Sequence, residues 1–202
     1  MSSTNRSNAR DRHISDYYKT PVRSIIDFLM EFDNDFQYFF NASQGIILDP
    51  CAGGRDALGI MHQNMSYPES LKTFKCVNQE NIRTIDIRPD SLAEIKGDYL
   101  QMVIDYKPSM IITNPPFSHA LPIIKKALND VADGGIVIML LRLNFFGSKE
   151  RFSFFEKNMP QVCYVHQRRM KFTDTSNTDS IEYMHAIWVK DQYPKFSQLR
   201  II

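Results

Sequence analysis

The first apolar pattern along the chain is helical and follows a polar beginning. Apolar residues recur at helix spacing along one face, at Val22, Ile25, Ile26, Leu29, Met30 and Phe32. Thr20 is predicted as the N-cap of this helix and Pro21 as its first residue, because a hydroxyl and a fixed φ suit these positions. Residues 1–13 hold too few apolar side chains to offset the entropy of ordering, so we expect a disordered arm there.

Short apolar runs then alternate with helical patterns. Strands are predicted at 46–48, 82–87, 110–113 and 136–141, and helices at 55–63 and 123–131. This alternation predicts a parallel sheet with right-handed crossovers. The unbroken apolar run Ile136–Leu141 is typical of a strand covered on both faces, and Gly134 and Gly135 are expected to cap the helix before it.

Two more strands are predicted at 162–166 and 183–190, joined by the polar loop 173–180. We expect them to pair as a closing antiparallel hairpin. Residues 64–80 have weak periodicity and are interpreted as an inserted loop. The chain contains no internal repeat or interdomain linker, so residues 14–202 are expected to form one α/β domain with helices on both faces of the sheet.

Composition narrows the class of protein. The chain has 202 residues, 43% of them hydrophobic and 23% charged, which excludes disordered and collagen-like chains. The net charge of +1 excludes a globally basic, histone-like coat. The basic excess lies in two blocks, +3 over residues 1–23 and +5 over residues 142–171. These blocks form either one cationic face or two ordinary solvated faces.

The cysteines and histidines indicate neither disulfides nor metal. Cys51, Cys76 and Cys163 are odd in number and widely spaced, which fits a reducing compartment. The five histidines, His13, His62, His119, His166 and His185, lack ligand spacing, so no metal site is expected. No apolar run is long enough to span a membrane and residues 1–13 lack a signal-peptide core. A cytoplasmic protein is expected, in the host cytoplasm if the chain is viral.

Polar residues follow two of the predicted strands, at the carboxyl ends where open parallel sheets bind ligands. Residues 49–53, Asp-Pro-Cys-Ala-Gly, form a turn whose glycine lets a ligand approach the backbone, although such turns also serve packing alone. Asp86 ends the next strand, where a carboxylate can accept both hydroxyls of a ribose. A surface turn in which Asp86 pairs with Arg88 is the alternative.

The sharpest signal follows the strand at 110–113. In Asn114-Pro115-Pro116-Phe117, two prolines stiffen the backbone and remove two amide donors, which leaves the Asn114 side chain and carbonyl groups as acceptors. Such a site binds an NH2 group. If the Asn114 oxygen and the Pro115 carbonyl accept its hydrogens, the nitrogen lone pair can turn towards an electrophile. Phe117 would stack on the ring that carries the amine; a rigid turn with a packing Phe is the alternative.

Together these segments resemble the S-adenosylmethionine-dependent methyltransferases of amino groups, in particular the compact, phage-like adenine-N6 DNA methyltransferases, from about residue 16 to 189. The resemblance implies a Rossmann-like class I methyltransferase fold. It makes Asn114, Pro115, Pro116 and Phe117 the catalytic motif. It implies cofactor contacts from Tyr18, Thr20, Pro21, Asp49, Pro50, Cys51, Ala52, Gly53, Asp86, Asp98, Tyr99 and Asn114.

The resemblance also implies how the substrate is held. Phe117 and Phe172 would stack on the adenine flipped out of DNA, and Arg168, Arg169 and Lys171 would contact phosphate. The chain departs from the family at Gly53-Gly54-Arg55, where the usual spacing is Gly, any residue, Gly. It also lacks a separate target-recognition domain, so a protein partner is a candidate for that role.

The sequence thus predicts an S-adenosylmethionine-dependent DNA adenine-N6 methyltransferase. Two alternatives stay open. The same chemistry could act on RNA adenine or on a glutamine amide of a protein, and a binding protein or subunit could keep the fold without turnover.

Overall fold

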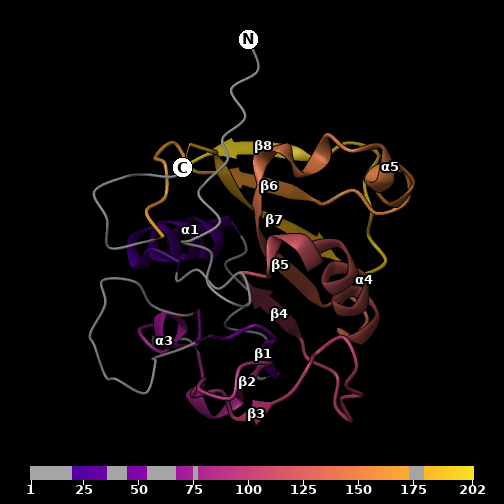
Figure 1. Cartoon of the computed structure of the whole chain (residues 1–202). Helices are drawn as coiled ribbons and strands as arrows, with labels where there is room; N and C mark the ends of the chain where they lie inside the picture. The colour runs from indigo at the N-terminus through magenta and orange to yellow at the C-terminus, as the bar shows by residue number, and fades with distance from the viewer. Residues whose placement is uncertain (1–19, 36–44, 54–66, 75–76, 173–179) are drawn as a thin grey trace, which may run out of the picture.

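The computed structural model describes residues 20–35, 45–53, 67–74, 77–172 and 180–202. Over these ranges the chain builds one eight-stranded sheet in the order β3-β2-β1-β4-β5-β7-β6-β8 (Figure 1). The strands are β1 (Ile47–Asp49), β2 (Ile82–Asp86), β3 (Ile95–Lys96), β4 (Met110–Thr113), β5 (Ile136–Arg142), β6 (Val162–Val165), β7 (Tyr183–Val189) and β8 (Gln198–Ile201).

The sheet is parallel except for one strand. β1 pairs in parallel with β2 and β4, and β4 pairs in parallel with β5. β7 is antiparallel to both of its neighbours, β5 and β6, and the register sets Arg142 opposite Tyr183. The predicted parallel sheet with a closing antiparallel hairpin is therefore confirmed, with β7 inserted between β5 and β6.

Helices cover both faces of the sheet, as predicted. α1 (Val22–Asp35) and α3 (Tyr67–Leu71) lie on one face, and α4 (Ala120–Asp130) and α5 (Lys149–Phe155) on the other (Figure 1). Three short 3-10 helices complete the described elements: η1 (Gln79–Asn81), η2 (Phe117–His119) and η3 (Leu143–Phe146). Within the described ranges, no helix combines the length and apolar character needed to cross a membrane.

The unbroken apolar run of β5 reflects the burial of both faces of this strand. Its side chains alternate between two cores because successive residues of a strand point to opposite faces. Val137 and Met139 pack with the residues of α4, whereas Ile138 and Leu140 pack with those of α1. Each of these four side chains is fully buried, so neither face of the strand tolerates a polar residue.

The predicted start of the first helix and the predicted end of the helix before β5 were each wrong by one residue. α1 begins at Val22 rather than Pro21, since the Pro21 carbonyl already accepts the first helical bond, from Ile25 N at 3.2 Å. α4 ends at Asp130, because the fully buried Val131 turns into an extended conformation. Gly134, with φ of 70°, belongs to the turn into β5 and does not cap the helix.

The strands β3 and β8 and the helices α3 and α5 were not predicted. β3 has two residues and β8 is exposed at every position, so neither carries an apolar pattern. α3 and η1 lie inside the predicted loop 64–80, which is thus partly helical. The predicted arm 1–13, the predicted helix 55–63, Tyr18 and most of the loop 173–180 fall outside the described residues.

Candidate functional site

The carboxyl ends of β1, β2 and β4 lie side by side because β1 is paired with both other strands. Asp49 ends β1, Asp86 ends β2 and Asn114 follows β4. The strand order reverses between β1 and β4, and in open α/β sheets such a reversal opens the ligand crevice. The fold therefore brings together the three strand ends that the sequence singled out.

Asp49 ties β1 to β4 beneath this crevice. Its Oδ1 accepts a hydrogen bond from Thr113 Oγ1 at 2.6 Å and from Cys51 N at 3.1 Å. The side chain is almost fully buried, and this desolvation raises the pKa of Asp49 to about 7, although both hydrogen bonds oppose the rise. Asp49 thus shapes the turn at residues 50–53 from below.

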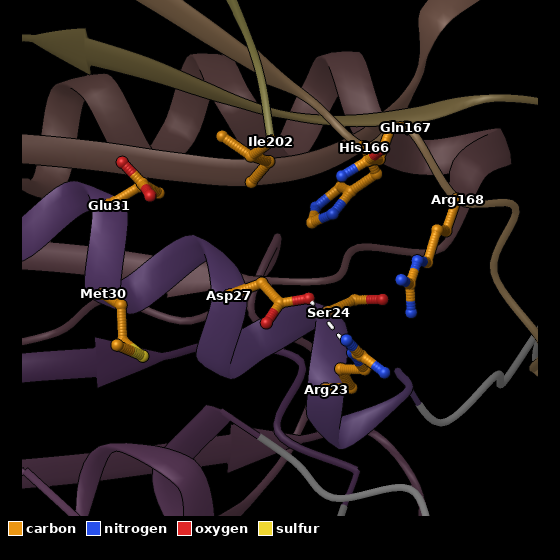
Figure 2. Close-up of a pocket in the computed structure, with 9 residues that line it drawn as sticks. All are labelled: Arg23, Ser24, Asp27, Met30, Glu31, His166, Gln167, Arg168 and Ile202. Carbon is orange, nitrogen blue, oxygen red and sulfur yellow. Dashed lines mark ion pairs between the residues drawn. The ribbon is translucent and has the colours of Figure 1, made fainter.

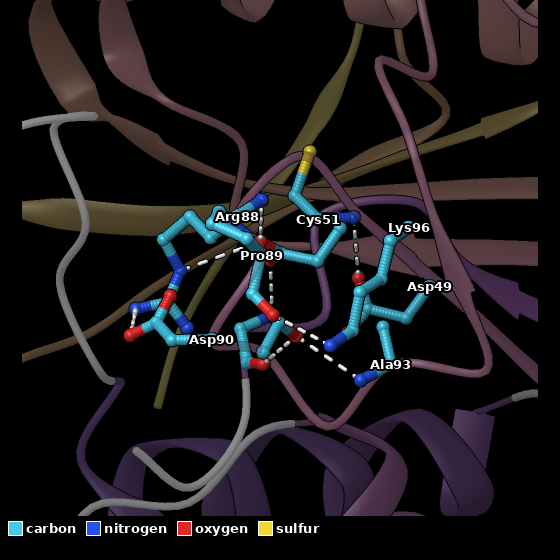
Figure 3. Close-up of polar contacts among 10 residues, drawn as sticks. Asp49, Cys51, Arg88, Pro89, Asp90, Ala93 and Lys96 are labelled. Atoms are coloured by element: carbon cyan, nitrogen blue, oxygen red, sulfur yellow. Dashed lines mark hydrogen bonds and ion pairs between the residues drawn. The ribbon is translucent and has the colours of Figure 1, made fainter. Parts of the chain in front are cut away.

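Asp86 holds the same turn through hydrogen bonds. Its Oδ2 accepts from Gly53 N at 2.6 Å, and its Oδ1 accepts from Arg88 N at 2.8 Å and Arg88 Nε at 3.3 Å. Figure 3 shows Cys51 and Arg88 of this region. Gly53 has a φ of 59°, and the Ser91 hydroxyl donates to its carbonyl. Each carboxylate oxygen has two acceptor positions, so among the described residues one position on Asp86 Oδ2 is left for a ligand.

Asp86 forms an ion pair with Arg88, as the alternative interpretation of Asp86 expected, but the pair is not at the surface. Asp86 and Arg88 are 5% and 6% exposed, so the ion pair is buried rather than part of a surface turn. Arg88 also reaches the partly exposed Asp90 at 3.7 Å. A buried pair of this kind fixes the carboxylate in place, which suits a group that must meet a ligand in one orientation.

The segment with Asp98 and Tyr99 lies next to the end of β2, because Gly97 N donates to the Asp86 carbonyl at 2.9 Å. Asp98 accepts from Leu100 N at 3.0 Å. The Tyr99 hydroxyl instead donates to Asp130 Oδ2 at 2.9 Å, on the α4 side of the sheet. The predicted cofactor contacts of Asp98 and Tyr99 stay predictions. The Tyr99 hydroxyl uses its proton in the buried hydrogen bond to Asp130.

Asn114 contacts the predicted N-terminal cofactor segment. Its Nδ2 donates to Thr20 Oγ1 at 3.1 Å, although 94 residues separate the two. The Thr20 hydroxyl therefore serves Asn114 and does not cap α1. Pro115 is buried, and Pro116 is the N-cap of η2, whose first residue is Phe117.

Phe117 and Phe172, the predicted walls for the base, share a neighbour. The Tyr183 ring lies 5.6 Å from the Phe117 ring and 4.9 Å from the Phe172 ring, measured between centroids. The Arg142 guanidinium covers the Phe117 ring at 4.4 Å. Neither Tyr183 nor Arg142 is among the residues predicted for the site. Arg142 could have been found as the charged residue that ends the apolar run at 136–141, whereas Tyr183 is placed only by the pairing of β7 with β5.

A cavity of about 290 Å³ lies beside α1 (Figure 2). Arg23, the one described basic residue of the first block, and Arg168 of the second both line it, together with Asp27 and Glu31. Arg23 pairs with Asp27 at 3.6 Å, so this surface has mixed charge and is not a uniform cationic face. Elsewhere, Arg169 pairs with Glu182 at 3.2 Å.

Neither a protein-family model nor a curated protein sequence matches the chain. Solved structures do match its fold. A protein described as an RNA methyltransferase from Pyrococcus horikoshii aligns with a TM-score of 0.57 and 14% identity, over 86% of this chain and 87% of that one. A protein described as a class I S-adenosylmethionine-dependent methyltransferase from Listeria monocytogenes aligns with a TM-score of 0.56 and 13% identity, over 89% of this chain and 64% of its own.

The M protein of the type I restriction enzyme EcoKI also aligns, with a TM-score of 0.53 and 13% identity. The alignment covers 89% of this chain and 45% of that protein, so this chain spans less than half of its length. At such identities the likeness establishes architecture. This chain has the Rossmann-like fold of class I S-adenosylmethionine-dependent methyltransferases.

Proposed function

We propose that the chain is an S-adenosylmethionine-dependent methyltransferase that acts on the N6 amine of adenine in DNA. The observation that carries this proposal is the position of Asn114-Pro115-Pro116-Phe117 at the end of β4, next to the strand ends that bear Asp49 and Asp86. A fold alone does not imply a function, so the argument rests on this site.

The residues at the strand ends fit the cofactor. Gly53 has a left-handed backbone with no side chain in the way, and Asp86 keeps an acceptor position for a ribose hydroxyl. Asp86, Gly53 and the segment at Asp98 would hold the nucleoside, and Thr20 and Pro21 would lie near the methionine part. When bound, the cofactor supplies a methyl carbon that its sulfonium makes electrophilic.

Asn114 and Pro115 would prepare the amine. Their oxygens accept its two hydrogens, so the nitrogen lone pair leaves the plane of the ring and points at the methyl carbon. The methyl group would pass from the sulfur to this nitrogen, and the methylated amine would then lose one proton to water. Positive charge develops on the nitrogen, which neutral acceptors stabilise without a titrating base.

DNA is the proposed substrate, and the contacts of both Phe117 and Phe172 with Tyr183 support the proposal by setting the two aromatic rings beside one shared neighbour. Phe117 and Phe172 supply ring faces for a flipped base, and Arg168, Arg169 and Lys171 are near enough in sequence to Phe172 to meet its phosphates. Arg142 covers one face of Phe117, so the base uses the opposite face or displaces the guanidinium. A partner protein is proposed to supply target recognition, as a fold neighbour from Vibrio vulnificus is described as the modification subunit of a type I restriction enzyme.

The test is methyl transfer from labelled S-adenosylmethionine to a mixture of DNA, RNA and peptides, followed by digestion to nucleosides and amino acids. Label in N6-methyl-2′-deoxyadenosine is expected, whereas label in N6-methyladenosine would indicate RNA. Asn114→Ala should lose turnover by about 100-fold or more while the cofactor Kd stays within a few fold. Equal losses of turnover and cofactor affinity would contradict the role of Asn114.

RNA adenine is the second candidate, because a fold neighbour that aligns over 87% of its own length is described as an RNA methyltransferase. The same digestion separates the two candidates, and label in glutamine would indicate a protein substrate. A protein that binds nothing in calorimetry at millimolar S-adenosylmethionine would instead be a non-catalytic subunit.

A further inference from the structure

The arginine that ends β5 lies on the predicted base-stacking ring and has no charged partner. The Arg142 guanidinium covers the Phe117 ring at 4.4 Å from its centroid. Its Nε is buried and has no hydrogen-bond partner among the described residues. No carboxylate in the described ranges forms an ion pair with Arg142. Five other arginines have such an acidic partner: Arg23, Arg83, Arg88, Arg169 and Arg200.

Arg151 shows the same stacking contact with its donor satisfied. Its guanidinium also lies 4.4 Å from the centroid of a phenylalanine ring, that of Phe145. The Arg151 Nε, however, donates to the Phe145 carbonyl at 2.6 Å. A buried N–H without an acceptor is costly, because it has given up its bonds to water and gained none in return. Arg142 thus lacks the acceptor that Arg151 has, and a ligand with such an acceptor would supply it.

Arg142 lies on the same side of the sheet as Asn114. Side chains alternate along β5, and Leu140, two residues earlier, packs in the α1 core, so Arg142 is directed to the α1 face as well. Tyr183, opposite Arg142 in the register, is buried in that core. Asn114 contacts Thr20, which lies just before α1. Because β4 and β5 are paired, Arg142 and Asn114 stand at neighbouring strand ends on the α1 side.

A phosphate group suits this cation better than the phenylalanine ring does. A guanidinium presents planar N–H donors, Nε among them, in a fork that matches phosphate oxygens. The phosphate of a nucleotide is joined to its base through one sugar, so it stays close to the ring on which that base stacks. An uncompensated cation would also oppose methyl transfer, because positive charge develops on the amine. Pairing with a phosphate removes this repulsion.

We propose that Arg142 binds the phosphate next to the target adenine and, in the free protein, occupies the ring face of Phe117 that the base takes. When the base stacks on this face, the guanidinium moves from the ring to the phosphate, where its Nε gains an acceptor. This inference rests on the proposed function for the identity of the base. It adds a phosphate requirement, which favours a nucleic acid over a glutamine amide as the substrate.

Binding of single-stranded oligonucleotides tests the phosphate contact. Each oligonucleotide carries one adenine among thymines, and a methylphosphonate replaces the phosphate on the 5′ or the 3′ side of that adenine, which removes one negative charge. One of the two replacements should weaken binding to the parent by about tenfold and have little effect in Arg142→Gln. Arg142→Gln should also lower the slope of log Kd against log salt concentration by about 0.7.

Arg142→Lys should bind the unmodified oligonucleotide better than Arg142→Gln, since lysine keeps the charge but loses the planar fork. Three outcomes would overturn the inference: a methylphosphonate effect that persists in Arg142→Gln, no effect at either linkage in the parent, or no binding of the oligonucleotide by the parent.

Arg151→Gln is the matched control. It removes the same charge and the same kind of stacking contact, on a ring that packs in the opposite core. Its affinity for the oligonucleotide should stay within about twofold of the parent, because a distant charge is screened by salt, and the methylphosphonate should keep its effect. Equal losses of affinity in Arg151→Gln and Arg142→Gln would mean that only net charge is at stake, and the inference would be wrong.

A second measurement follows the guanidinium itself. In 1H–15N spectra, the Arg142 Nε–H signal is identified by its loss in Arg142→Gln. It should move downfield when the oligonucleotide is added, because the proton leaves the shielding ring of Phe117 and gains an acceptor. The Arg151 signal should keep its place. An Arg142 signal that does not move at saturating oligonucleotide would overturn the inference.

Two further readouts separate this inference from its rivals. The Kd for S-adenosylmethionine should be the same in Arg142→Gln as in the parent; a loss of cofactor affinity would mean that the guanidinium pairs with the methionine carboxylate, and would overturn the inference. A parent with the methylphosphonate effect but no methyl transfer would refute the proposed function and leave the phosphate contact standing. Methyl transfer to DNA by a parent without that effect would refute the phosphate contact alone.

Discussion

Asp49 should make folding stability depend on pH in an unusual direction. The carboxyl group is 2% exposed, and burial raises its pKa from 3.8 to about 7. In the unfolded chain this group ionises near pH 4, whereas in the folded chain it keeps its proton up to about pH 7. The folded state therefore binds more protons across this interval, and its stability falls as pH rises.

The size of the effect follows from the two pKa values. A tenfold change in proton affinity is worth about 1.4 kcal/mol, so the rise from 3.8 to about 7 corresponds to about 4 kcal/mol. Most of this, about 3 kcal/mol, is expected between pH 5 and pH 9, where the folded group titrates. The stabilising contribution is fully present below pH 4 and lost above about pH 7.

Urea denaturation of the parent and of Asp49→Asn, from pH 5 to pH 9, isolates this contribution. Other groups that titrate cancel in the difference between the two free energies of unfolding, and the parent should lose about 3 kcal/mol relative to the variant as pH rises. Thr113→Val removes a hydrogen bond that favours the carboxylate, so it should move the midpoint to higher pH. A difference that stays flat with pH would refute the reasoning.

Three further outcomes are expected. Asp86→Asn removes the charge opposite the buried Arg88. This change should lower the free energy of unfolding in urea by about 3 kcal/mol and weaken S-adenosylmethionine binding in calorimetry by at least about tenfold. Unchanged values for both would contradict the role of Asp86. Gly135→Ala places a Cβ 2.8 Å from the Ala132 oxygen and 2.9 Å from the Ser109 oxygen, and should cost about 1 to 3 kcal/mol in thermal or urea unfolding, more than Gly147→Ala, whose Cβ would stand 3.6 Å from the Asn144 oxygen. Because burial lowers the pKa of His166 from 6.5 to about 4, the unfolded chain binds more protons in that interval and stability should fall on acidification from pH 6.5 to 4; His166→Gln should show a shallower fall.

Much of the candidate site was predictable because its signals are local. Asp49, Asp86 and Asn114 each follow directly on an apolar run, and parallel strands bring their carboxyl ends to one edge. The two prolines after Asn114 restrict the local backbone and remove amide donors whatever the surrounding tertiary structure is. The hydrogen-bond partners of these residues were not predictable. Asp86 bonds to Gly53 and Arg88, and Asn114 bonds to Thr20, because the order of the strands in the sheet brings these segments together.

β3 and β8 could not be predicted from the pattern of neighbouring residues. β8 is exposed and β3 has two residues, so sheet pairing alone creates them. Arg142 and Tyr183 lie opposite each other through the register of β5 and β7, which no spacing along the chain encodes. The contact of both residues with Phe117 follows from that register and changes how the predicted base-stacking face is interpreted.

The sequence by itself determined the alternation of strands and helices, the coverage of both sheet faces and the acceptor-rich turn after β4, because periodicity and proline stiffness act over a few residues. Only the tertiary structure decided the insertion of β7 between β5 and β6, the contact of Asn114 with Thr20 and the buried hydrogen bond between Tyr67 and His185. Tyr67 and His185 are 118 residues apart, and Thr20 and Asn114 are 94 apart. Contacts over such separations depend on how the whole core packs, since burial leaves each polar group only the partners that the packing supplies.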